Sequence, residues 1–162
     1  METSSGILLA IDGEQHTESA IQWALDLASV LNCELTAVHV RDPYLKQFFN
    51  DIYAQGREEY LEHVDKCLVI RGEEAVSSFE SAAAKAGVRH RTVILDGDPV
   101  EKIRSELCSH KYHLLILGRK ANTGIAAWRS RDLPSKLTDA LKDIPVLVVP
   151  ESCGLRKQKD PQ

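Results

Sequence analysis

The chain lacks the features that mark several common classes of protein. None of its apolar runs approaches the roughly 20 residues needed to cross a membrane, so we expect no membrane partner. The formal net charge is −4, so nucleic acid is not an expected partner either. The four cysteines are irregularly spaced and form no C-x-x-C pair, which favours reduced thiols over a disulfide framework. At 162 residues, the chain has the length of one domain with a proper core.

Several motifs of catalytic and metal-binding proteins are also missing. There is no G-x-G-x-x-G, no G-x-x-x-x-G-K-[ST] and no G-x-S-x-G, which argues against a dinucleotide site, a Walker NTPase and a hydrolase elbow. The histidines form no H-E-x-x-H. Cys108, His110 and His113 are close enough in sequence for a metal site to be one interpretation. Because they straddle a predicted helix end and strand start, we expect surface and core side chains there and no metal. Because no nucleophile–base pair stands out, we expect no catalytic residues and no enzyme beyond a weak ATPase side activity.

The two ends of the chain suggest its location and its domain limits. The opening residues METSSGILLAID have no basic segment before an apolar one, so we expect no signal peptide and a cytoplasmic protein. Residues 1–150 are predicted to form one domain. The polar residues 151–162 are predicted to be a disordered tail.

Short apolar segments alternate with amphipathic ones along the rest of the chain. Helices are predicted over 17–32, through most of 44–87, from Asp98 onward and over 133–143. In "GDPVEKIRSEL", Asp98 suits the N-cap, Pro99 the first helical position and Glu101 the capping box. Gly87 is a candidate C-cap. Strands are predicted at 6–11, 35–40, 89–95, 112–117 and 145–149. This order predicts an α/β fold, with a five-stranded parallel sheet between two helix layers.

Ligands of such sheets bind beyond the carboxyl ends of the strands, which makes Asp12 and the polar segment 118–132 the candidate site. Asp12 could accept hydrogen bonds from ribose hydroxyls or help to hold a metal on phosphates. Alternatively, it is a turn aspartate bonded to its own backbone before Gly13. Gly118 lets backbone N–H groups approach an anion, and the segment's cations would add charge. The alternative is a plain glycine turn with a solvated basic surface.

Five segments together resemble the universal stress protein family: "ILLAIDGEQHTESAIQWALDLA", "LTAVHV", "GDPVEKI", "YHLLILGRK" and "IPVLVV". They extend from residue 6 to residue 149. The resemblance implies a Rossmann-like fold of the adenine nucleotide alpha hydrolase-like type, with strand order 3-2-1-4-5. In that order the first and fourth strands are neighbours, and Asp12 and Gly118 lie on either side of the crevice between their diverging connections.

The resemblance also implies a site for ATP or AMP, which many members bind. Asp12 would lie by the ribose and Val40 against the adenine. The phosphates of those members sit in a G-x2-G-x9-G-[ST] loop, of which this chain keeps Gly118 but has Ala121, Arg131 and Asp132 at the other signature positions. A side chain fills the space that a glycine leaves for phosphate, and a carboxylate repels it. The chain is therefore expected to resemble the members that bind no nucleotide.

Two functions follow from the resemblance. The first is a cytoplasmic stress-response regulator with a degenerate nucleotide loop and no required cofactor. Its apolar final strand, an edge strand in the family order, would pair with a symmetry mate in a homodimer. The alternative is a sensor that binds ATP, with Mg²⁺, or AMP through a variant phosphate loop at 118–132. In that case charge would replace the glycine backbone, and the phosphates would contact Arg119, Gly124, Ser130 and Arg131.

Overall fold

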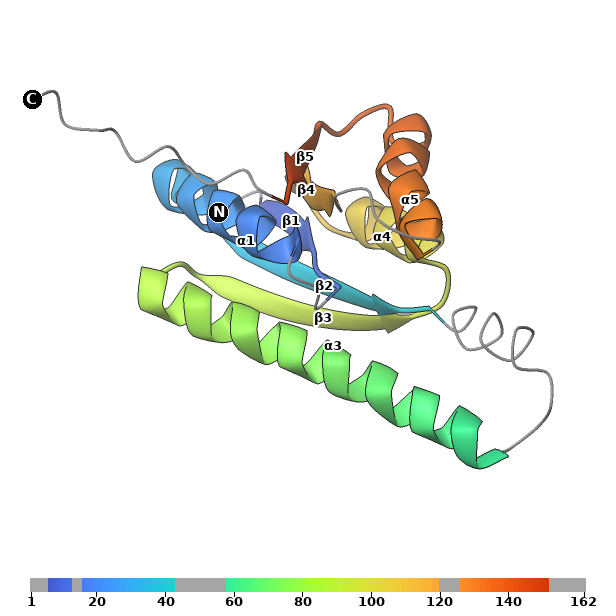
Figure 1. Cartoon of the computed structure of the whole chain (residues 1–162). Coiled ribbons are helices and arrows are strands. Elements are labelled where there is room, and N and C mark those ends of the chain that lie inside the picture. The colour runs from blue at the N-terminus through green and yellow to red at the C-terminus, as the bar shows by residue number, and fades with distance from the viewer. Residues whose placement is uncertain (1–5, 13–15, 43–57, 120–125, 152–162) are drawn as a thin grey trace, which may run out of the picture.

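The computed structural model describes residues 6–12, 16–42, 58–119 and 126–151. The chain alternates strands and helices throughout these ranges, as predicted (Figure 1). The elements are β1 (Gly6–Ala10), α1 (His16–Leu31), β2 (Leu35–Arg41), α3 (Glu58–Ala86), β3 (His90–Asp96), α4 (Pro99–Ser109), β4 (Tyr112–Arg119), α5 (Ala126–Ala140) and β5 (Val146–Pro150). The first part of the helix predicted within 44–87 and nearly all of the predicted tail lie outside the described residues.

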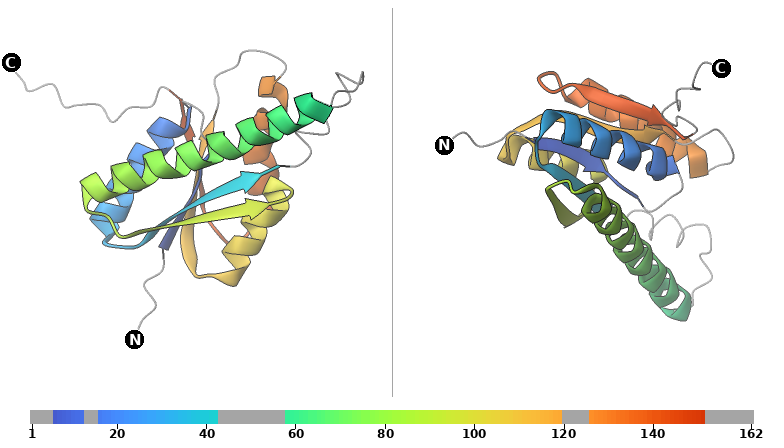
Figure 2. Two further views of the ribbon diagram at one scale, coloured as in Figure 1. Left: turned by 90° about the horizontal axis from the view of Figure 1, so that it is seen from below. Right: turned by 90° about the vertical axis from the view of Figure 1, so that its left-hand side faces the viewer.

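The five strands form one parallel sheet in the order β3-β2-β1-β4-β5, which confirms the prediction. Helices α1 and α3 cover one face and α4 and α5 the other (Figures 1 and 2). Right-handed crossovers explain these layers, because the chain moves outward from β1 to β3 and then crosses β1 to reach β4 and β5.

The core lies in two layers, one on each face of the sheet. Successive residues of β1 alternate between them: Ile7 and Leu9 pack with α1 and α3, while Leu8 packs with α4 and α5. Phe79 of α3 is fully buried in the first layer, and Leu137 of α5 in the second. A strand buried on both faces favours apolar residues at successive positions, which is why β1 and residues 114–117 of β4 are continuous apolar runs.

The helix boundaries at α3 and α4 follow the predicted capping residues. The Asp98 side chain accepts a hydrogen bond from the Glu101 N–H at 3.0 Å, and Pro99 begins α4. After α3, Gly87 has a φ of +67°, a left-handed conformation that glycine adopts without strain. Its N–H and that of Val88 bond back to the last turn of the helix. Both caps are therefore confirmed.

The prediction for the last helix was wrong at its start. Helix α5 begins at Ala126 rather than at residue 133, so Ser130 and Arg131 lie within a helix and not in a loop spanning 118–132. The segment Ala126–Arg131 is rich in alanine and arginine, which favour helix, and this preference extends the helix ahead of Pro134. The connection from β4 to α5 is correspondingly reduced to residues 120–125.

Candidate functional site

The candidate site lies at the carboxyl ends of β1, β2 and β4, where the strand order reverses. Ala10, the last residue of β1, pairs with Val38 on one side and with Leu117 on the other. The connection after β1 leads to β2, whereas the one after β4 leads to β5, so the two diverge at this edge. This is the topological switch point at which sheets of this kind bind ligands.

Asp12 lies just beyond β1 and is exposed to solvent. Its Oδ1 atom accepts a hydrogen bond of 2.5 Å from the Oγ1 hydroxyl of Thr17, which is buried in the first turn of α1. The preceding residue, Ile11, donates its N–H to the Val38 carbonyl at 2.9 Å. The carboxylate is thus held at the switch point by the start of α1, a partner that the sequence does not indicate.

Val40 and Arg41 form the β2 side of this edge. Val40 is partly buried against the core layer under α4 and α5, so it offers an apolar surface next to the crevice. The Arg41 guanidinium pairs with Asp96 at the end of β3, with Nε 2.7 Å from Oδ1 and Nη2 donating to Oδ2 at 2.8 Å. The Gly97 N–H donates to the Arg41 carbonyl at 3.0 Å, which links the ends of β2 and β3.

Gly118 and Arg119 lie on the opposite side, and both belong to β4 rather than to a loop. They pair with Val149 and Pro150 of β5, and Arg119 is exposed. The structure therefore brings Asp12, Val40, Gly118 and Arg119 to one edge of the sheet. Of the remaining predicted site residues, Gly124 lies outside the described residues, while Ser130 and Arg131 are described only as backbone within α5.

A second link closes the α1 side of this edge. The Ser19 hydroxyl donates to the Glu151 carbonyl at 2.6 Å, which joins the first turns of α1 to the end of β5. Only tertiary structure reveals this bond, because 132 residues separate its partners. A hydroxyl in the first turns of a helix was the available sequence signal, and it is common to many N-termini.

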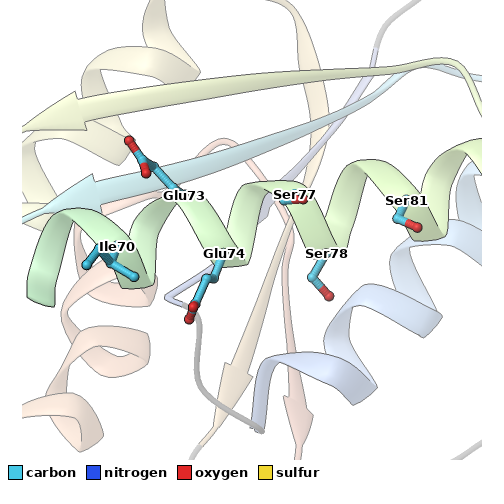
Figure 3. A pocket seen from close by; sticks show the side chains of 6 residues that line it. All are labelled: Ile70, Glu73, Glu74, Ser77, Ser78 and Ser81. Atoms are coloured by element: carbon cyan, nitrogen blue, oxygen red, sulfur yellow. The ribbon is translucent and has the colours of Figure 1, made fainter.

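A shallow hollow lies on α3, away from these strand ends (Figure 3). It has a volume of about 500 Å³, and its lining includes two carboxylates and three hydroxyls but no basic side chain. It therefore lacks the charge needed to hold a phosphate. The lining residues are Ile70, Glu73, Glu74, Ser77, Ser78 and Ser81.

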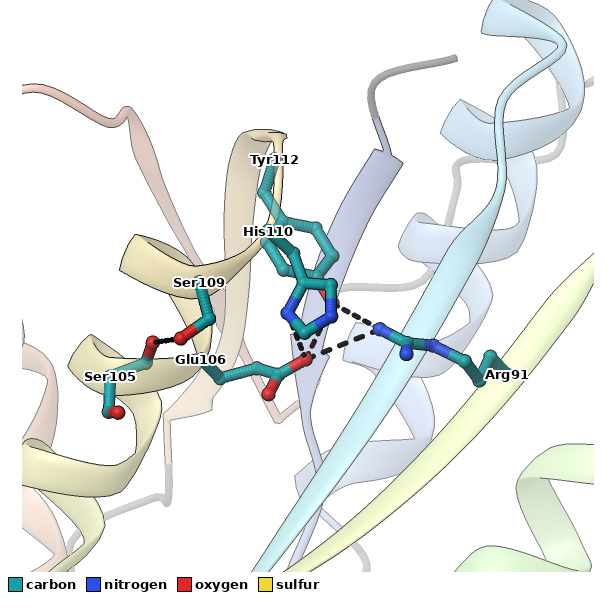
Figure 4. A network of polar contacts seen from close by, with 6 residues as sticks. All are labelled: Arg91, Ser105, Glu106, Ser109, His110 and Tyr112. Atoms are coloured by element: carbon teal, nitrogen blue, oxygen red, sulfur yellow. Dashed lines mark hydrogen bonds and ion pairs between the residues drawn. The ribbon is translucent and has the colours of Figure 1, made fainter. Parts of the chain in front are cut away.

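A polar network around the buried Glu106 and Tyr112 lies at the amino end of β4 (Figure 4). Tyr112 donates to Glu106 Oε1 at 2.9 Å and accepts from Arg91 Nη2 at 2.9 Å. The same Oε1 atom lies 3.2 Å from His110 Nδ1. Burial, more than any other cause, raises the pKa of the Tyr112 phenol above its ordinary value. The network joins β3, α4 and β4.

Neither a cluster of metal-ligating side chains nor a membrane-spanning helix is found in the part of the chain that the structure describes. There, no group of three or more His, Cys, Asp or Glu side chains is placed to hold a metal ion. None of the described helices has the length and apolarity to span a bilayer.

The strand order and the two helix layers define a doubly wound parallel α/β domain with its topological switch point between β1 and β4. A model of the universal stress protein family matches residues 5–150, and the chain belongs to that family. It is 23% identical over 144 residues to "Universal stress protein YxiE" of Bacillus subtilis, covering 88% of this chain and 97% of the relative.

Solved structures of family members share the fold. A universal stress protein in complex with cAMP superimposes with a TM-score of 0.63 at 20% identity, covering 93% of this chain and 100% of that one. A family member from Arabidopsis thaliana with AMP bound gives a TM-score of 0.62 at 14% identity, covering 90% and 91%. At these identities the likeness establishes the fold.

Proposed function

We propose that this chain is a non-catalytic, cytoplasmic regulator of the stress response that acts as a homodimer and does not depend on tight nucleotide binding. The observation that carries the proposal is the early start of α5. Arg131 and Asp132 stand where the nucleotide-binding motif has Gly-[ST], and both lie in the second turn of this helix. The N–H groups there are used within the helix, since only about the first four are left without an internal partner. They are not available to wrap a phosphate.

A second candidate function is an adenine nucleotide sensor. The adenosine half of the crevice favours it, because Asp12 and Val40 flank the same edge, and relatives of the same fold were solved with cAMP and AMP. Phosphate would then be held by side-chain charge such as that of Arg119, which is exposed. ATP would bring Mg²⁺ coordinated mostly by its own phosphates.

Calorimetric titration with ATP, AMP and cAMP at low and high salt distinguishes the two functions. The main proposal predicts no heat of binding. The sensor predicts weak binding that falls steeply with salt and drops in Arg119→Ala, because attraction between solvated charges is screened over about 8 Å at physiological ionic strength. Arg104→Ala is a matched control, since Arg104 is an exposed arginine on α4. Tight ATP binding that is insensitive to salt and lost in Asp12→Ala would refute both.

The proposed dimer rests on the edge strand β5. Leu115 donates its N–H to the Pro145 carbonyl at 3.0 Å, so residue 145 faces β4. Backbone groups of a strand alternate in direction, and Val146 and Val148 therefore present their N–H and C=O groups away from β4. Their side chains are only partly buried. An apolar edge of this kind is an aggregation hazard unless it is paired, and antiparallel pairing with a second β5 about a two-fold axis would cover it.

A further inference from the structure

His39 of β2 is a buried polar side chain that the crevice chemistry does not use. Its ring points to the α1/α3 face of the sheet, and only about 7% of the residue is exposed. The Nδ1 atom lies 2.9 Å from the carbonyl oxygen of Ile11. Because a carbonyl only accepts, Nδ1 carries the proton in this bond. The ring thus holds the peptide that joins Ile11 to Asp12.

The far side of the same ring rests against Gly72 in the middle of α3. A Cβ atom placed on Gly72 would lie 2.8 Å from His39 Nε2 and 2.9 Å from its Cδ2, closer than carbon atoms approach in real structures. The ring cannot simply swing away, since its Nδ1 is bonded to the Ile11 carbonyl. Glycine is a poor residue inside a helix, and α3 carries it where the histidine ring needs the space.

These contacts form a continuous connection from α3 to the mouth of the crevice. Gly72 contacts the His39 ring, the ring bonds to the Ile11 carbonyl, and the Asp12 N–H belongs to the same peptide unit. We propose that His39 is a positioning residue that couples the placement of α3 to the orientation of the Asp12 peptide. Gly72 is the position in α3 that leaves room for the His39 ring. The proposal deepens the proposed function by adding a control element to its crevice, but it needs no bound ligand.

Three substitutions separate the hydrogen bond of His39 to Ile11 from the packing of its ring against Gly72. His39→Asn keeps a donor near the position of Nδ1 and removes the part of the ring that faces Gly72. His39→Leu removes the donor as well. Gly72→Ala tests whether the ring needs the space beside Gly72. Helix preference alone would make this substitution stabilising, whereas a clash with a ring held by its hydrogen bond makes it destabilising.

The experiment combines urea unfolding with ¹⁵N NMR of the protein without ligand. In the natural chain, a protonated Nδ1 is expected for His39. Gly72→Ala should increase the unfolding equilibrium constant roughly tenfold and shift the Asp12 amide nitrogen resonance. In the His39→Asn background the same change should be neutral or stabilising.

If Gly72→Ala fails to fold, the two His39 variants still test the proposal. The Asp12 amide nitrogen should stay near its natural resonance in His39→Asn and move in His39→Leu, which packing alone would not produce. The proposal is overturned if Gly72→Ala stabilises the natural chain, or if the Asp12 resonance is the same in His39→Leu as in the natural chain. Nucleotide titration is a separate measurement, so failure of the proposed function is visible independently.

Discussion

Replacing Tyr112 by phenylalanine removes one hydroxyl from the polar network around Glu106 and leaves the ring. The hydroxyl donates to Glu106 Oε1 and accepts from Arg91, both at 2.9 Å. A hydrogen bond to a charged group contributes about 1.5–3 kcal/mol, and the lower part of that range applies because the Arg91 side chain is 42% exposed. Tyr112→Phe should therefore lower the free energy of unfolding by about 1.5–2 kcal/mol, which is a fall in Tm of roughly 3–8 °C.

Urea unfolding followed by circular dichroism measures this loss. Ser109→Ala is the matched control, since it removes an exposed hydroxyl that bonds to the Ser105 carbonyl on the same helix α4. That control should change stability by less than about 0.5 kcal/mol. Equal stability of Tyr112→Phe and the natural chain would show that the Glu106 carboxylate gains nothing from the phenol, and the reasoning would be refuted.

The same variant has a pH signature. Burial, as the largest cause, raises the pKa of Tyr112 in the folded protein above its ordinary value of 10.0. Below that pH both states hold the phenol proton, and its contribution is fully present. As the pH rises further, the unfolded chain releases its proton first, so stability falls until the folded pKa is passed. This part of the alkaline loss should be missing in Tyr112→Phe.

Three further outcomes follow from the packing. Val148→Pro should remove an outward-facing donor from β5 and yield monomers or insoluble protein by light scattering, whereas a dimer of unchanged mass would exclude this interface. Asp98→Ala should cost about 1 kcal/mol through loss of the α4 cap, and Asp98→Asn should retain most of it in the same unfolding assay. Phe79→Ala should cost about 3–5 kcal/mol, against little change for the exposed Ser78→Ala; a loss below 1 kcal/mol would contradict the packing.

The fold was predictable because its signals are local. Parallel strands buried on both faces are uninterrupted apolar runs, and Asp98 and Gly87 mark helix ends through bonds to nearby residues. The sheet order came from the family resemblance, and the structure confirms it. The position of Asp12 at the carboxyl end of β1 was predictable because it directly follows the first apolar run.

The rest depended on contacts between distant residues or on patterns with two interpretations. A segment rich in arginine and alanine is compatible with an exposed loop and with an exposed helix. The start of α5 was therefore predicted seven residues late. The bond from His39 to Ile11 spans 28 residues and exists only because β1 and β2 pair in one register. A single histidine in an apolar strand carries no sequence signal of what it contacts.

Helix α3 is much longer than the sheet it covers. Its 29 residues extend about 43 Å, whereas the seven residues of β3 extend about 23 Å, and the amino-terminal half projects past the strands (Figures 1 and 2). Among the α3 residues whose exposure is described, the buried ones begin only at Gly72 and continue through Ala75, Phe79 and Ala83. Protection of backbone amides from hydrogen exchange should therefore form a gradient along one continuous helix, weakest at its amino end and strongest near Phe79. A displacement of the amino-terminal half would therefore reach the buried part of the helix at Gly72, the residue that contacts the His39 ring.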